Sequence, residues 1–163
     1  MEPAIRVNCG LLCDILIRMH YLHTMVRVND INEALDFYCN KLGLIEFSRR
    51  DDEKGKYTNV FLRAPGDIVT PEHKAPLLEL TYNWTGEEYT GGRNFGHLCY
   101  AVDNIYKYCE RLQKLGITIL RPPKEGRMAF IKSPDGISIE LLQAGEALPV
   151  QEPWKSMSNK GSW

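Results

Sequence analysis

Two histidines and two glutamates stand at matching positions in two similar halves of this sequence. His23 and His97 each begin an apolar segment, and Glu79 and Glu140 each lie inside one, in the stretches LLEL and IELL. An ionised carboxylate inside an apolar strand is costly unless a partner compensates its charge. Two imidazoles and two carboxylates, with positions left for water, suit an octahedral divalent cation such as nickel, cobalt, manganese or zinc. The four residues therefore predict a metal site.

Each of these residues also has an ordinary structural interpretation. A single histidine beside an apolar segment is more often a hydrogen-bonded structural residue than a metal ligand. Either glutamate could instead pair with an arginine such as Arg27 or Arg93. The duplication favours the metal, because packing does not require histidine and glutamate to recur at equivalent positions of two halves.

An internal repeat defines the elements that must position the four side chains. HTMVRVNDI, residues 23–31, aligns without a gap on HLCYAVDNI, residues 97–105, and each copy continues to a Leu-Gly pair. The Asp or Asn that ends each first segment is a good helix N-cap, and the glycine is a good C-cap. Each half therefore begins with a strand and a helix. The expected apolar stripes of the helices are Ile31, Ala34, Leu35, Tyr38 and Leu42, and Ile105, Tyr108, Cys109, Leu112 and Leu115.

Three further strands are expected in each half. The candidates are LIEFSRRD, YTNVFLRAP and APLLELTYNW in the first half, and ITILRP, RMAFIKSP and ISIELLQ in the second. The SPDG segment between the last two is typical of a hairpin turn. The expected fold class is α+β, with two paired βαβββ modules whose curved, mixed sheets can bring the four side chains together. Because side chains alternate along a strand, His23 should share a face with Arg27, and Glu79 with Asn83.

The chain length fits one domain with two segments outside it. We expect an N-terminal extension at 1–18, a domain at 19–143 with modules at about 19–86 and 94–143, and a tail at 144–163. Met19 could be the true start. The tail, with Pro149, Pro153 and little periodicity, is typical of an extended arm or a partly disordered end, although its two tryptophans could pack on the body or on a partner subunit.

Composition excludes several classes of protein. The formal net charge is −1, so the surface as a whole should attract neither nucleic acid nor an anionic membrane. The five cysteines are odd in number and contain no CxxC pair, which is a poor disulfide framework and favours a reducing cytoplasm. No GxSxG, P-loop or GxGxxG motif occurs.

Six segments carry a strong resemblance to a known family. LHTMVRV, DFYCNKLGL, LLELTYNW, NFGHLCYAV, MAFIKSPDG and ISIELLQ, in this order, resemble the glyoxalase I enzymes (lactoylglutathione lyases), which belong to the vicinal oxygen chelate superfamily. The likeness covers about residues 19–143, and it implies the paired βαβββ fold. All four metal positions of the family are filled by residues of the right type, His23, Glu79, His97 and Glu140.

The resemblance implies a carbon–sulfur lyase that detoxifies methylglyoxal. The substrate would be the hemithioacetal of methylglyoxal and glutathione, and the product S-lactoylglutathione. The reaction needs a base for a weakly acidic C–H and stabilisation of the resulting enediolate, which a metal ion provides as a Lewis acid. By analogy with the family, Glu140 is the expected base and Glu79 its counterpart on the opposite side of the site.

The resemblance also implies the cofactor and the assembly. A compact chain with His at the first ligand position resembles the forms most active with nickel or cobalt, with zinc as the alternative, and one divalent ion is expected per site. Two-module enzymes of this kind resemble homodimers with shared sites, in which His23 and Glu79 come from one chain and His97 and Glu140 from the other.

Glutathione carries two carboxylates, so its site should offer fixed cations and amides. Three residues match family positions that hold the glutamyl end, and two basic residues are candidates for the glycyl carboxylate. These are Arg27, Asn83 and Arg93 for the first group, and Lys124 and Arg127 for the second.

Other functions of the superfamily stay open at this point, since a fold does not determine chemistry. A methylmalonyl-CoA epimerase also uses a metal and a glutamate base, but that family tends to have Gln where Glu79 stands. A drug-binding protein of the bleomycin-resistance kind needs neither metal nor base, and an extradiol dioxygenase needs only three ligands. Trypanothione or another thiol could replace glutathione. Ser138 stands where some family members have an aromatic residue.

Overall fold

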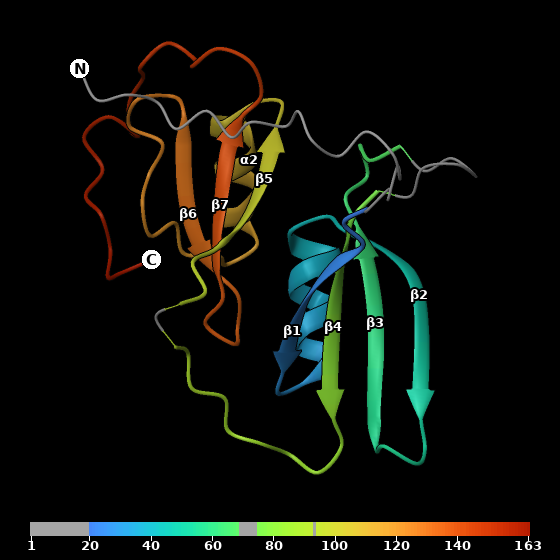
Figure 1. Cartoon of the computed structure of the whole chain (residues 1–163). Coiled ribbons are helices and arrows are strands. Elements are labelled where there is room, and N and C mark those ends of the chain that lie inside the picture. The colour runs from blue at the N-terminus through green and yellow to red at the C-terminus, as the bar shows by residue number, and fades with distance from the viewer. Residues whose placement is uncertain (1–19, 69–74, 93) are drawn as a thin grey trace, which may run out of the picture.

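The computed structural model describes residues 20–68, 75–92 and 94–163 of the chain. Figure 1 shows two sheets side by side, each with its helical segment behind it. The two sheets belong to the two halves of the internal repeat. The extension at 1–18 lies outside the described residues.

The first module has the expected βαβββ order. Its sheet runs β1-β4-β3-β2, with β1 parallel to β4 and the other neighbours antiparallel. Its elements are β1 (His23–Val28), α1 (Ile31–Leu35), a π-helix η1 (Asp36–Lys41), β2 (Ile45–Asp52), β3 (Tyr57–Arg63) and β4 (Leu77–Asn83). The π-helical turn was not expected, and its wider hydrogen bond runs from the Leu42 amide to the Phe37 carbonyl at 2.8 Å.

The second module has the same order of elements, but the first of its three expected strands after the helix is reduced to a single bridge. Its elements are β5 (Leu98–Val102), α2 (Ile105–Lys114), β6 (Met128–Lys132) and β7 (Ser138–Gln143), in a sheet ordered β5-β7-β6. The expected strand ITILRP survives only as a bridge between Arg121 and Phe130. Pro122 and Pro123 follow the bridge directly, and since neither has an N–H to donate, the ladder ends there.

Both helical segments begin and end as the sequence predicts. The Asp30 side chain accepts hydrogen bonds from two backbone amides at the start of α1, and Asn104 does the same for one amide of α2. Gly43 and Gly116 close the segments with φ values of +91° and +81°, a conformation that favours glycine.

The helical segments of the two modules contact each other and share one buried core. Ala34 and Tyr38 of the first module lie in the same buried cluster as Ile105, Cys109 and Leu112 of the second. Across this contact Arg111 of α2 donates a hydrogen bond of 3.2 Å to the Asn40 carbonyl, and the Tyr108 hydroxyl donates to the Leu42 carbonyl.

The helical side of the first sheet is covered, and the opposite face of β1 stays open. In β1 the burial alternates, with Val26 and Val28 buried against the helical side and Met25 and Arg27 exposed on the other. His23 lies on this exposed face. The alternation therefore places two predicted site residues, His23 and Arg27, on the open side of the sheet.

The tail packs on the second module, which agrees with the alternative that its tryptophans pack on the body and not with a disordered end. Trp154 is 1% exposed, and its ring stacks on Tyr106 of α2 with centroids 6.3 Å apart. Figure 1 shows the red C-terminal segment running along the outer side of β6. At its end the Trp163 ring stacks on Phe130 at 5.9 Å.

The tail also explains one of the two errors in the predicted stripe of α2. Tyr106 is buried although it was not expected in the stripe, whereas Leu115 is 40% exposed. Tyr106 is covered because Trp154 lies on it. None of the helices in the described part of the chain has the length and apolar character needed to cross a membrane.

Candidate metal and substrate site

Each module brings one histidine and one glutamate into direct contact. His23 at the start of β1 and Glu79 in the adjacent strand β4 place Nε2 and Oε2 3.0 Å apart. His97, directly before β5, and Glu140 in the adjacent strand β7 place the same two atoms 2.9 Å apart. The costly carboxylate of each apolar strand therefore has an imidazole as its partner.

The surroundings of the two pairs are duplicated as well. Phe61 lies opposite Glu79 in the β3–β4 register, and its ring meets His23 edge to face at 5.9 Å. Phe130 lies opposite Glu140 in the β6–β7 register, and its ring meets His97 edge to face at 5.5 Å. The repeat thus extends from the sequence to the geometry of each pair.

The two members of each pair differ in exposure. Both histidine side chains are 42% exposed, whereas the side chains of Glu79 and Glu140 are only 10% and 13% exposed. The imidazoles can therefore receive a ligand from solvent, and the carboxylates lie below them in sites from which most water is excluded.

One chain holds the four side chains as two pairs and not as one cluster. Among the residues that the structure describes, no group of three or more His, Cys, Asp or Glu side chains is placed to hold a metal ion. All four predicted ligands belong to that described part. Each module therefore presents a half-site of two donors.

The separation within each pair fits two ligands of one divalent ion. Two donors that are each about 2.1 Å from an ion and at right angles to each other are about 3 Å apart. The distances of 3.0 and 2.9 Å agree with this geometry. Two such pairs supply two imidazole nitrogens and two carboxylate oxygens, a mixed donor set suited to first-row divalent metals.

Cys99 lies opposite Glu140 in the β5–β7 register but is unsuited to act as a thiolate. Burial, and then the negative charge of Glu140, raise the pKa of the Cys99 thiol to about 11. The thiol is therefore protonated at neutral pH and is a poor nucleophile.

Two of the residues predicted to hold the glutamyl end of glutathione are described. Arg27 is exposed on the His23 face of β1, and its backbone pairs with Thr81 of β4. Asn83, at the end of β4, is partly buried, and its amide donates a hydrogen bond of 3.2 Å to the Tyr89 hydroxyl. Arg93 lies outside the described residues.

The two candidates for the glycyl carboxylate lie in the turn before β6. The Arg127 guanidinium donates to the Gly145 carbonyl, so it ties the beginning of the tail to the module. Lys124 is partly buried in the same turn. Arg127 therefore also has a structural role, because it holds the start of the tail. Binding of substrate by Arg127 stays a prediction.

Asn59 is a site residue that the sequence interpretation missed. Its Nδ2 donates a hydrogen bond of 2.6 Å to Oε1 of Glu79, and its Oδ1 accepts one of 3.2 Å from the Thr81 hydroxyl. A signal was present in the strand YTNVFLR, where alternation puts Asn59 and Phe61 on one face. That Asn59 meets Glu79 follows only from the pairing of β3 with β4.

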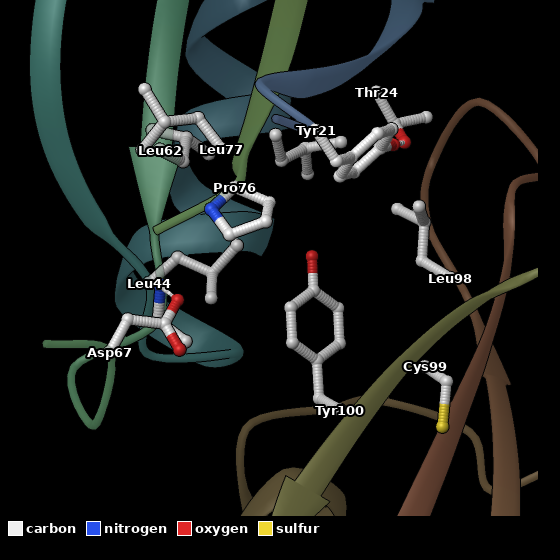
Figure 2. A pocket seen from close by; sticks show the side chains of 12 residues that line it. Tyr21, Thr24, Leu44, Leu62, Asp67, Pro76, Leu77, Leu98, Cys99 and Tyr100 are labelled. Atoms are coloured by element: carbon white, nitrogen blue, oxygen red, sulfur yellow. Dashed lines mark hydrogen bonds between the residues drawn. The ribbon is translucent and has the colours of Figure 1, made fainter. Parts of the chain in front are cut away.

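A separate cavity lies at the junction of the modules. Its volume is about 290 Å³, and Leu62, Pro76, Leu98 and Tyr100 are among the residues that line it. Figure 2 shows the Tyr100 side chain extending into this space, with Pro76 opposite its hydroxyl. The four histidine and glutamate residues do not line it, so it is not the predicted site.

Several known proteins are similar to this chain over most of its length. The family profile described as Glyoxalase/Bleomycin resistance protein/Dioxygenase superfamily matches residues 20–141. The lactoylglutathione lyase of Neisseria meningitidis serogroup B is 40% identical over 130 residues, covering 77% of this chain and 91% of the relative. That of Salmonella typhimurium is 37% identical over 134 residues, covering 79% and 96%.

A solved structure gives the same result at the level of the fold. The trypanothione-dependent glyoxalase I of Leishmania major superposes with a TM-score of 0.69 at 34% identity, covering 77% of this chain and 87% of that one. Together with the two βαβββ modules and their duplicated histidine–glutamate pairs, these likenesses show that the chain belongs to the Glyoxalase/Bleomycin resistance protein/Dioxygenase superfamily.

Proposed function

We propose that this protein is a glyoxalase I that converts the hemithioacetal of methylglyoxal and glutathione into S-lactoylglutathione. The observation that carries the proposal is the duplicated contact between histidine and glutamate, at 3.0 Å in the first module and 2.9 Å in the second. The lactoylglutathione lyases compared above align with this chain across both modules. The activity is therefore assigned to residues that the fold brings together.

The reaction is an internal proton transfer that needs no oxidant or reductant. Glu140 takes the proton from the carbon that carries sulfur and hydroxyl, and the electron pair of that C–H bond enters the new enediolate. Glu140 then returns the proton to the neighbouring carbon, which had been the ketone carbon. The hydroxyl proton of the first carbon passes to the oxygen of the second, so the first carbon becomes the thioester carbonyl and the second carries the alcohol. The side chain of Glu140 is only 13% exposed, so the proton can stay on the carboxyl instead of exchanging freely with water.

Four residues would hold one divalent metal ion at each site, with nickel or cobalt preferred and zinc as the alternative. They are His23, Glu79, His97 and Glu140, whose nitrogen and oxygen donors suit all three metals. When bound, such an ion supplies Lewis-acid stabilisation of the negative charge that develops on the substrate oxygens.

We assign the complete site to a homodimer in which each site combines half-sites from two chains. The support is that one chain presents its ligands as two pairs, each with a histidine side chain that is 42% exposed. Apolar side chains also remain exposed in the first sheet, with Met25 39% and Phe47 48% exposed. A second copy would cover such side chains and complete two equivalent sites by symmetry.

Binding of the thiol part of the substrate is assigned to the predicted cations and amides. Arg27 and Asn83 approach the site along β1 and β4 and would hold the glutamyl end together with Arg93. Lys124 and Arg127 are the candidates for the glycyl carboxylate. Fixed positive charges suit this ligand because it carries two carboxylates.

We place the protein in the reducing cytoplasm. Within the described part of the chain, Cys39, Cys99 and Cys109 are free thiols. Free thiols are the ordinary state of cysteine in that compartment.

The experiment that tests the proposed function measures isomerisation of the methylglyoxal–glutathione hemithioacetal with metal-stripped protein. We expect near-complete loss of activity on stripping, and recovery when nickel or cobalt is added. Zinc is tested in parallel to establish the metal preference. A reloaded protein that is inactive with this adduct but racemises a CoA thioester would instead be an epimerase.

A further inference from the structure

We propose that Asn59 is a positioning residue that fixes Glu79, so that the two glutamates of the site perform different tasks. Asn59 Nδ2 lies 2.6 Å from Oε1 of Glu79, and His23 Nε2 lies 3.0 Å from Oε2 of the same carboxylate. Both oxygens of Glu79 are therefore engaged within the first module. This division of tasks depends on the proposed function, because only a proton-transfer enzyme needs one carboxylate to move.

The orientation of the Asn59 amide is itself determined by its neighbours. An ionised carboxylate only accepts hydrogen bonds, so Asn59 must turn its NH₂ group toward Glu79. Its carbonyl oxygen then faces Thr81, whose hydroxyl donates to it at 3.2 Å. Thr81 and Glu79 are both buried, so this chain of hydrogen bonds lies where water competes little.

The second module lacks the same restraint. Phe61 opposes Glu79 as Phe130 opposes Glu140, so the two registers can be compared position by position. Two positions further along, Asn59 opposes Thr81 in the first module, whereas Met128 opposes Leu142 in the second. Neither Met128 nor Leu142 has a side-chain donor.

The neighbour that Glu140 does have is a weak one. The Cys99 thiol lies opposite Glu140 in the β5–β7 register, and thiols are poor donors. Glu140 is thus held mainly by His97, whereas Glu79 is held by an imidazole and by an oriented amide.

This difference matches the two requirements of the reaction. A carboxylate that remains in place must keep one orientation, whereas a base must turn from one carbon of the substrate to the next. Glu79 has the restraints suited to the first task, and Glu140 has the freedom suited to the second. Asn59 therefore decides, through Glu79, which carboxylate carries the proton.

Asn59→Leu tests the restraint, because leucine keeps the side-chain size and removes the amide. We expect the metal dissociation constant to rise roughly tenfold, as is usual when a group that orients a metal ligand is lost. The visible absorption spectrum of the cobalt-loaded protein should change, because the orientation of Glu79 changes. Thr81→Val should cause a smaller shift in the same direction, and Thr81→Ser, which keeps the hydroxyl, should behave as the wild type.

Both readouts are independent of turnover, so they separate this inference from the proposed function. An inactive wild-type protein would reject the proposed function and, with it, the division of tasks. An active wild-type protein with an unchanged metal dissociation constant and cobalt spectrum in Asn59→Leu would overturn the role of Asn59 alone. Thermal unfolding of each variant verifies that it is folded. If Asn59→Leu does not fold, Thr81→Val tests the same restraint.

The reciprocal variant gives Glu140 the restraint that it lacks. Met128→Asn combined with Leu142→Thr copies the amide and hydroxyl of the first module into the second. We expect kcat to fall at least tenfold while the metal dissociation constant does not rise, because Glu140 is held without being removed. An unchanged kcat in a double variant whose cobalt spectrum has changed would overturn the assignment of the mobile carboxylate to Glu140.

Discussion

The Nε2 atom of His97 lies 2.9 Å from Oε2 of Glu140, and the two residues come from neighbouring parallel segments of one sheet. The first module repeats this contact between His23 and Glu79 at 3.0 Å. Parallel pairing of the first and last strands of each βαβββ unit creates the contact twice. The same strand pairing therefore produces both half-sites. Any functional difference between the two half-sites must come from the residues around each histidine–glutamate pair.

Glu140→Gln should separate catalysis from metal binding. The amide keeps the size of the side chain and an oxygen donor, but it cannot accept the proton. We expect kcat to fall by roughly 10²- to 10⁴-fold, the usual contribution of a general base, with a much smaller change in the metal dissociation constant. Single-turnover kinetics with metal-saturated protein measures the fall in the catalytic rate. Titration of metal-stripped protein measures the metal dissociation constant. A nearly unchanged kcat would remove Glu140 from the role of base.

Mixing two inactive variants should restore activity if each site is shared between two chains. His23→Ala and His97→Ala each damage both sites of a homodimer. A heterodimer of the two places both defects in one site and leaves the other intact. Random exchange makes about half of the dimers mixed, so about a quarter of the wild-type activity should return. If each chain held a complete site of its own, no mixture would regain activity.

The positions of the paired residues could be predicted from the sequence because they depend on local rules. Alternation along a strand, Asp30 and Asn104 as caps, and the glycine after each helical segment are all visible in the repeat. The loss of the strand ITILRP also has a local signal, because Pro122 and Pro123 have no N–H to donate to a ladder.

The contact between Asn59 and Glu79 had no such signal. It depends on the register of β3 against β4, which neither strand's own alternation determines. The place of Trp154 was hidden for a similar reason. Its partner Tyr106 lies on α2, far away in the sequence, and the tail itself has no periodicity from which burial can be inferred.

Trp154→Ala should destabilise the folded protein strongly. The side chain is 1% exposed and stacks on Tyr106, so its removal leaves a cavity in the core of the second module. We expect a loss of about 3–5 kcal/mol in the free energy of unfolding, measured by urea denaturation. Val150→Ala, at a tail residue that is 54% exposed, is the matched control and should change the value by no more than about 0.5 kcal/mol. Equal stability of the two variants would mean that the tail does not contribute to the core.

Alkaline pH should lower stability through groups that are buried in their protonated form. Burial raises the pKa of the Cys109 thiol from 9.0 to about 12, and that of the Tyr38 hydroxyl from 10.0 to about 12. Between the unfolded and folded pKa values the folded state binds more protons than the unfolded state. The stabilisation is therefore complete below about pH 9 and is lost as pH rises toward 12.

Urea denaturation at pH 8 and pH 10.5 measures this loss, and Cys109→Ala identifies the share of one group. Cys109 alone should account for about 2 kcal/mol between the two pH values, since each pKa unit corresponds to about 1.4 kcal/mol. The alanine variant should therefore lose less stability than the wild type over the same interval, even though its stability at pH 8 is lower. If both proteins lost the same amount, the Cys109 thiol would not be a group whose titration opposes folding.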